Sequence, residues 1–91
     1  MTAIDLDRAW DLHPLVSVRP EPFGALLYHF GTRRLSFLKD RRLLAVVQAL
    51  AHAPTARAAC LAAGLGEHEV PRYGRALAVL AQSSMVVGRT S

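Results

Sequence analysis

The first half of the chain carries short apolar runs separated by turn residues, a pattern that predicts three strands. Residues 15–19 are rich in β-branched side chains and indicate a first strand, which the rigid Pro20–Pro22 segment ends. Residues 24–30 indicate a second strand, and residues 33–35 begin a third after a tight turn at Gly31 and Thr32. Because the last two segments lie so close in sequence, we expect them to form a hairpin.

The second predicted strand is apolar on both sides. We assign the face with the larger side chains to the core: Leu26, Tyr28 and Phe30. The other face is the candidate contact surface for a partner, a second copy or the N-terminal arm: Ala25, Leu27 and His29. Trp10 could cover this second face, and His29 is interpreted as an ordinary polar strand residue.

Apolar residues then recur at helical spacings of three, four and seven: Leu38, Leu43, Leu44, Val47 and Leu50. Ser36 could serve as the N-cap of a helix over about residues 37–52, whereas Asp40 would cap a later start. Ala53 and Pro54 stop this helix. The sequence leaves both starts open.

Two further helices follow. Thr55 is placed to cap a short helix over residues 56–63, and Gly64 is placed to end it. A third helix begins near Glu67, with Pro71 in its first turn and a core stripe of Tyr73, Leu77 and Leu80. We expect Met85, Val86 and Val87 to fold back onto the core.

This order of elements predicts an α+β domain of three antiparallel strands followed by three helices. Residues 1–12 are expected to form an N-terminal arm, and residues 13–91 a single domain. The chain has 91 residues, of which 52% are hydrophobic, enough for one core and too few for two. It has no long apolar run and no secretory signal pattern, so we expect it in the cytoplasm and not in a membrane.

The charge is unevenly distributed. From residue 12 onward the sequence has ten Lys or Arg and four Asp or Glu, and Lys39 is the only lysine in the chain. Arg binds carboxylates and phosphates through a planar fork, so this composition favours an acidic partner. An acidic peptide, a nucleic acid and a membrane surface all satisfy that condition.

Few residues offer catalytic or metal-binding chemistry, so we expect no enzymatic activity, no cofactor and no metal. Cys60 is the only cysteine and is interpreted as a small buried residue. His68 with Glu67 or Glu69 could hold a metal, but a solvated helix start is the simpler interpretation. The Gly64–Gly66 segment lacks the further glycine of a dinucleotide-binding loop.

The most specific stretch runs from Arg19 to Leu44 and contains the block Pro-Phe-Gly-Ala-Leu-Leu-Tyr-His-Phe-Gly-Thr-Arg-Arg-Leu. It resembles the family of mycofactocin biosynthesis chaperones, which belongs to the precursor-recognition domains similar to the pyrroloquinoline-quinone peptide chaperone. The likeness is close from Val16 to Leu50 and weaker through residues 54–91.

The resemblance implies a winged-helix-like fold that binds the leader of a short ribosomal precursor peptide. Such a domain would present the peptide to a radical S-adenosylmethionine maturase, which oxidatively decarboxylates and crosslinks the peptide's C-terminal Val-Tyr. The iron–sulfur clusters and the S-adenosylmethionine would belong to that partner and not to this chain.

In such a domain the third strand lies at the edge of the sheet and pairs with the incoming peptide. The residues that would supply this strand are Thr32, Arg33, Arg34, Leu35 and Ser36. The third helix would form the opposite wall through Arg72, Arg75, Ala76 and Val79. Strand alternation places Arg33 and Arg34 on opposite faces, so only one of them would face the groove, and the sequence does not decide which.

A DNA-binding winged-helix regulator is the main alternative, since the chain is basic and ends in three helices. Against it, wing strands usually follow the recognition helix, and the third helix offers only Arg72 and Arg75 for reading bases. A small enzyme would require turnover by this chain alone. We therefore expect no nucleic-acid partner, and a monomer or a homodimer.

Overall fold

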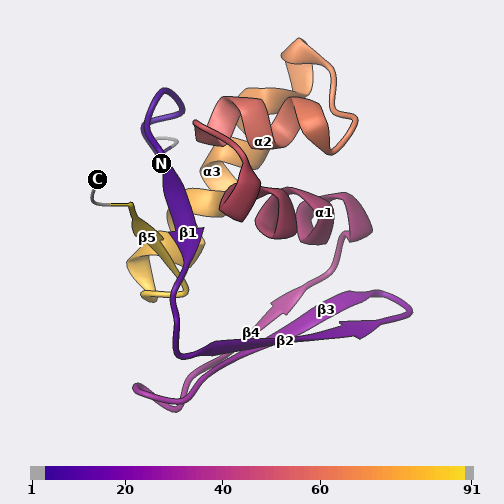
Figure 1. Cartoon of the computed structure of the whole chain (residues 1–91). Helices are drawn as coiled ribbons and strands as arrows, with labels where there is room; N and C mark the ends of the chain where they lie inside the picture. Colours follow the sequence, from indigo (N-terminus) through magenta and orange to yellow (C-terminus); the bar gives the residue numbers. More distant parts are fainter. Residues whose placement is uncertain (1–3, 90–91) are drawn as a thin grey trace.

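The computed structural model describes residues 4–89 and places the helices on one side of a three-stranded sheet (Figure 1). The strands are β1 (Trp10–Leu12), β2 (Val16–Glu21), β3 (Gly24–His29), β4 (Leu35–Leu38) and β5 (Val86–Gly88). The α-helices are α1 (Arg41–Ala49), α2 (Ala56–Ala62) and α3 (Val70–Gln82). The predicted α+β class, with a three-stranded antiparallel sheet and three helices, is confirmed.

The main sheet has the strand order β2-β3-β4, and both neighbouring pairs are antiparallel. The predicted hairpin between the second and third of these strands is therefore confirmed. β2 extends further than predicted, because Pro20 lies within the strand and pairs with Ala25. A proline lacks a backbone N–H, so it is tolerated at such an edge.

The prediction for the third strand was wrong in its position. β4 begins at Leu35, so Thr32, Arg33 and Arg34 lie in the turn before it and not in the strand. Arg33 has a left-handed backbone with φ of 62°, which a strand residue does not adopt. The expectation that strand alternation separates Arg33 from Arg34 therefore fails.

His29 explains why the turn is longer than predicted. Its Nδ1 accepts hydrogen bonds from the backbone N–H groups of Gly31 at 3.0 Å and Thr32 at 3.1 Å. Its own backbone N–H donates to the carbonyl of Arg34 at 2.9 Å. His29 is the last residue of β3, so it is a strand residue as predicted, but it is only 3% exposed and its ring organises the turn.

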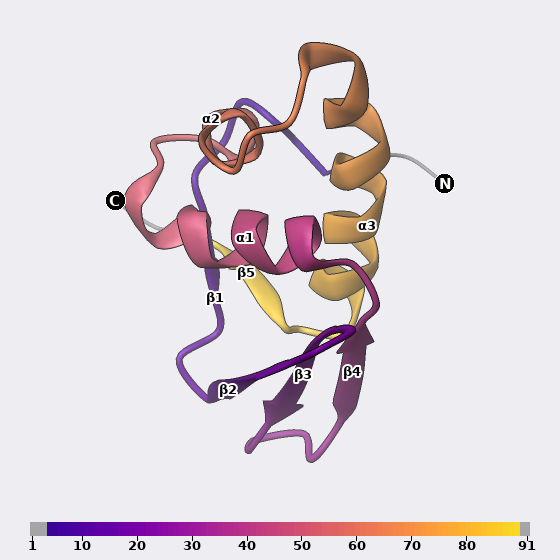
Figure 2. The same cartoon turned by 90° about the vertical axis from the view of Figure 1, so that its right-hand side faces the viewer.

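The assignment of the two faces of β3 was reversed. Ala25 and Leu27 are fully buried, whereas Leu26 and Tyr28 are half-buried and Phe30 is 62% exposed beyond the end of the strand. Both faces are apolar, so alternation alone could not decide between them. The helices lie on one side of the sheet (Figure 2), and Leu27 belongs to the buried core cluster, so the packed helices decide which face becomes the core.

The first helix takes the later of the two predicted starts. The Asp40 side chain accepts from the backbone N–H of Arg42 at 2.7 Å, so Asp40 is the N-cap. Ser36 lies in β4 and caps no helix, and Leu38 likewise belongs to the strand. After Ala49 the helix tightens into a 3-10 turn over Leu50–His52.

The other two helices follow the prediction closely. Thr55 caps α2 by accepting from the N–H of Ala58 at 3.0 Å, and a 3-10 turn over Glu67–Glu69 leads into α3. The predicted core stripe of α3 is buried: Tyr73, Leu77 and Leu80. Met85 and Val86 are also buried, so the chain does fold back after α3 as predicted.

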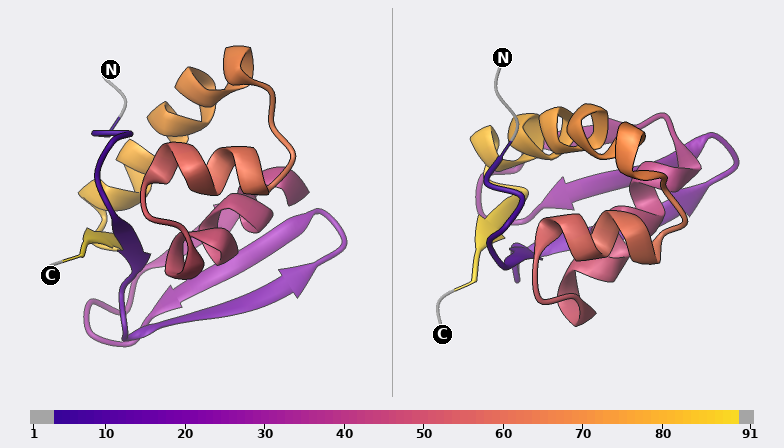
Figure 3. Two further views of the ribbon diagram at one scale, coloured as in Figure 1. Left: turned by 45° about the horizontal axis from the view of Figure 1, so that its top comes forward. Right: turned by 90° about the horizontal axis from the view of Figure 1, so that it is seen from above.

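A second, two-stranded sheet was not predicted. β1 pairs antiparallel with β5 (Figure 3), and in this pair Trp10 lies opposite Gly88. Arg89 stabilises this pair. Its guanidinium donates two hydrogen bonds to the Asp11 carboxylate, at 2.9 and 3.1 Å, and one to the carbonyl of Leu50 at 2.6 Å. The β1–β5 pair therefore ties both ends of the described chain to the end of α1.

The reassigned faces of β3 can be tested by comparing two leucines that are adjacent in sequence. We expect Leu27→Ala to lower the free energy of unfolding by about 2–5 kcal/mol, because it opens a cavity in the core. Leu26→Ala removes a half-buried side chain and should cost clearly less. Urea denaturation measures both, and an equal or larger loss for Leu26→Ala would contradict the assignment.

Candidate functional site

Two surface cavities lie between α3 and the segment that contains β4. The larger is about 660 Å³ and is lined by Lys39, Asp40, Arg41, Leu43, Arg72, Tyr73 and Ala76. The smaller is about 330 Å³ and is lined by Thr32, Arg34, Gln82, Ser83 and Ser84. The larger cavity lies between the C-terminal end of β4 and the first turns of α3. The smaller cavity lies between the segment before β4 and the C-terminal end of α3.

β4 is an edge strand. The order β2-β3-β4 leaves one of its sides without a strand partner among residues 4–89. β5 does not fill this side, because it pairs with β1 instead. An edge strand keeps N–H and C=O groups available at alternate residues, which another extended chain can use.

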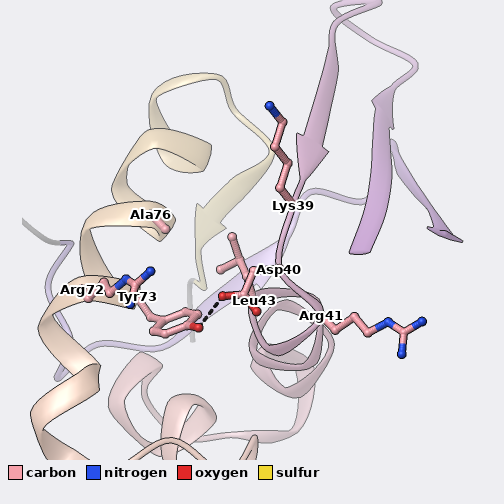
Figure 4. Close-up of a pocket in the computed structure, with 7 residues that line it drawn as sticks. All are labelled: Lys39, Asp40, Arg41, Leu43, Arg72, Tyr73 and Ala76. Atoms are coloured by element: carbon pink, nitrogen blue, oxygen red, sulfur yellow. Dashed lines mark hydrogen bonds between the residues drawn. The ribbon is translucent and has the colours of Figure 1, made fainter. Parts of the chain in front are cut away.

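A hydrogen bond from Tyr73 to Asp40 joins the two walls of the larger cavity (Figure 4). The Tyr73 hydroxyl donates to one carboxylate oxygen of Asp40, while the other oxygen caps α1. Asp40 follows β4 by two residues, and Tyr73 lies on α3. The contact therefore fixes the end of β4, the start of α1 and the first turn of α3 relative to one another.

This contact also shifts the acidity of both side chains. The hydrogen bond donated by Tyr73 is the largest cause that holds the pKa of Asp40 below its usual value. The backbone N–H groups at the start of α1 lower this pKa further. Burial, followed by the hydrogen bond to Asp40, raises the pKa of Tyr73. At neutral pH the pair is thus a carboxylate that accepts from a neutral phenol.

Cationic side chains surround the Tyr73 ring. The guanidinium carbons of Arg42 and Arg72 lie 5.6 and 6.0 Å from its ring centre. Arg42 is itself paired with Glu69 at 2.9 Å, whereas Arg72 lines the cavity and is exposed. Lys39 and Arg41 add two more cations, so the larger cavity is positively charged despite Asp40.

The structure brings together only part of the predicted site. Thr32 and Arg34 line the smaller cavity, and Arg72 and Ala76 line the larger. Three predicted residues line neither cavity. Arg33 lies in the turn before β4, and Arg75 and Val79 lie on α3. Leu35 and Ser36 lie on β4 and would contribute through their backbone.

Several cavity residues were not predicted as part of the site. Tyr73 was assigned to the core, and it is indeed only 3% exposed, yet its ring also lines the larger cavity. Asp40 was considered only as a helix cap. The Arg-rich run after β4 was a signal that could have identified Lys39 and Arg41.

The described residues offer little other chemistry. No group of three or more His, Cys, Asp or Glu side chains that could hold a metal ion occurs within residues 4–89. Cys60 is fully buried, and burial raises the pKa of its thiol, which disfavours the reactive thiolate. None of the helices in that range is long and apolar enough to cross a membrane.

Replacing Tyr73 by Phe tests the link between the walls. We expect Tyr73→Phe to lower the free energy of unfolding at neutral pH by about 1.5–3 kcal/mol, the worth of one hydrogen bond to a charged group. The variant's Asp40 should titrate closer to the ordinary value of 3.8. The lowered pKa of Asp40 contributes stability that is fully present above 3.8 and is lost as pH falls through the lower folded-state value. The difference from wild type should therefore shrink progressively as pH falls below 3.8.

Urea denaturation between neutral and acidic pH measures this effect. Tyr28→Phe is the matched control, since the Tyr28 hydroxyl makes no hydrogen bond with residues 4–89. A Tyr73→Phe loss that does not depend on pH would contradict the role given to the Asp40 carboxylate.

Comparison with known proteins gives consistent matches. The model of the Peptide chaperone MftB family matches residues 9–87. A protein described as Peptide chaperone MftB, from Mycobacterium tuberculosis (strain ATCC 25618 / H37Rv), is 62% identical over 85 residues, which are 93% of this chain and 78% of the relative.

A Peptide chaperone MftB from Mycolicibacterium smegmatis (strain ATCC 700084 / mc(2)155) is 58% identical over 83 residues, covering 91% of this chain and 81% of that protein. The search of solved structures found no match. Since the family model spans most of the sequence and these relatives align over nearly all of it, the chain belongs to the Peptide chaperone MftB family.

Proposed function

We propose that this chain is a peptide chaperone of mycofactocin biosynthesis, which binds the leader of a precursor peptide and presents it to a radical S-adenosylmethionine maturase. Membership of a family of peptide chaperones supports peptide binding as its activity. The observation that carries the proposal is the free edge of β4, which has a cavity shared with α3 at each end. In this role the chain catalyses no reaction itself and acts in the cytoplasm.

The peptide would bind as an added strand. We call the space that includes both cavities and the free edge of β4 the β4–α3 groove. An extended leader pairs with the backbone of β4, which gives affinity with little demand on sequence. β2 forms the other edge of the sheet, but Pro20 removes one of its donors and neither cavity adjoins that strand.

Side chains of the groove would select the peptide. Arg72 and Lys39 are exposed cations in the larger cavity, and both can pair with carboxylates of an acidic leader. The small side chain of Ala76 leaves room for an apolar anchor against Tyr73. On the next turn of α3, Val79 is 48% exposed and offers a further apolar contact.

The remaining chemistry would belong to the maturase. Its iron–sulfur clusters and S-adenosylmethionine perform the oxidative step, while this chain holds the leader in a defined register. We further propose that the fold is a winged-helix-like variant, in which strands β2 to β4 precede the three helices. Within the groove, Arg34 at one end and Arg72 at the other would position the leader along β4.

Binding can be followed residue by residue. Isotope-labelled protein titrated with the leader peptide should show saturable NMR shifts in residues 32–38 and 71–80, because these segments border the groove. The control is a peptide of the same composition in scrambled order. Shifts confined to β2 or α2, or no saturation, would contradict the assignment.

Filling the larger cavity tests the groove directly. We expect Ala76→Trp to weaken leader binding by roughly tenfold or more, because the indole occupies the space of an anchor side chain. Ala62→Trp on α2 is the matched control, since Ala62 is exposed and lines neither cavity. Fluorescence anisotropy of a labelled leader measures both, and equal affinities would exclude this cavity.

A further inference from the structure

The uncovered face of the main sheet carries an unusual number of exposed apolar side chains. Four of the most exposed large hydrophobic residues in the described chain gather there: Phe23 at 48%, Phe30 at 62%, Leu35 at 54% and Phe37 at 61%. A soluble domain rarely leaves such a contiguous patch unpartnered. We call these four residues, with Leu26 and Tyr28, the outer sheet face.

Strand register shows that these residues belong to one surface. Leu26 lies opposite Phe37, and Tyr28 lies opposite Leu35, so each pair shares a side of the sheet. Aromatic contacts extend the surface at both ends, since Phe30 packs edge-on against Tyr28 at 4.9 Å and Phe23 lies 6.5 Å from Phe37. The helices all lie on the opposite side of this sheet (Figure 1).

The border of the outer sheet face is cationic. Five exposed basic residues lie on it or in the segments next to it: Arg19 and Arg33, together with Arg34, Lys39 and Arg41, which also line the two cavities of the groove. Only two acidic residues lie between residues 16 and 41, and the carboxylate of each already has a partner within the chain. Glu21 pairs with Arg19 at 2.9 Å, and Asp40 accepts from Tyr73 and from the start of α1.

This charge distribution favours a different protein over a second copy of the chain as the binding partner of this face. A second copy stacked on the same face would bring two sets of five cations together, which like-charge repulsion disfavours. An apolar protein surface bordered by Asp and Glu complements both features, since such interfaces combine an aromatic centre with a charged rim. Arginines around aromatic anchors are also the residues that most often dominate interface energetics.

We propose that the outer sheet face docks a protein partner that presents an apolar patch bordered by carboxylates. Resting on the function proposed above, that partner is the enzyme that modifies the bound peptide. β4 belongs to both surfaces, because its free edge borders the groove while Leu35 and Phe37 project from its outer side. A partner on this face therefore meets the peptide beside the strand that holds it.

The test separates partner binding from peptide binding. Phe37→Glu places a negative charge in the middle of the outer sheet face and should weaken affinity for the radical S-adenosylmethionine enzyme by roughly 30-fold, the size of an interface hot spot. Because Phe37 lies on β4, the two affinities are separated with Arg19→Glu, a change on β2 away from both cavities, which should leave affinity for the leader peptide unchanged. Leu61→Glu is the matched control, because Leu61 is 40% exposed on α2, away from this sheet.

A charge variant provides an independent second measurement. Arg19 is 77% exposed, so Arg19→Glu should fold normally and should weaken enzyme binding most at low salt. Isothermal titration of the full chain with the enzyme, and separately with the leader, measures both affinities. Unchanged enzyme affinity in both variants, or no enzyme binding by the wild type, overturns the inference.

Three further outcomes remain distinct from one another. Phe37-dependent binding to vesicles of phosphatidylserine and phosphatidylcholine, without enzyme binding, would make this face a membrane surface and overturn the inference. Phe37-dependent dimerisation would do the same in favour of a second copy. A wild-type chain that binds the enzyme but no leader would refute the proposed function while supporting the docking surface.

Discussion

The arrangement of the groove depends on one carboxylate that serves three elements at once. Asp40 follows β4, caps α1 through one oxygen and accepts from Tyr73 of α3 through the other. A hydrogen bond to an ionised acceptor is stronger than one between neutral groups, so this contact resists a shift of α3 relative to the strand. It links the two walls of the larger cavity, and in the proposed function this link would pre-organise the cavity for a peptide.

The two surfaces of β4 follow from this arrangement. Because Asp40 and Tyr73 hold α3 beside the strand, the helix borders the strand's free edge without pairing with it. The other helices cover only the inner face, where Leu27 is buried. In the proposed function the free edge of β4 binds the peptide, and the outer face of the same strand stays accessible to a second partner.

Local signals in the sequence identified the helices well. Thr55 as a cap, Pro71 in a first turn and the stripe through Tyr73 and Leu77 depend on residues close together in the chain, so they could be predicted. The Arg72 and Ala76 side of α3 followed from the same periodicity.

Features that depend on distant residues could not be predicted in this way. The faces of β3 were reversed because both are apolar and only the packed helices distinguish them. The turn before β4 was misplaced because the ring of His29 accepts two backbone N–H groups, which no turn propensity records. The β1–β5 pair joins residues more than seventy positions apart, and the Asp40–Tyr73 contact spans thirty-three, so neither leaves a local pattern.

Backbone hydrogen exchange of β4 measures most directly whether an extended peptide pairs with this edge. With saturating leader peptide, the amides between Leu35 and Leu38 that point away from β3 should exchange at least roughly tenfold more slowly, since each gains a hydrogen-bonded partner. The amides of β2 should be unaffected. Saturated binding that leaves β4 exchange unchanged, or that protects β2 instead, would contradict the account.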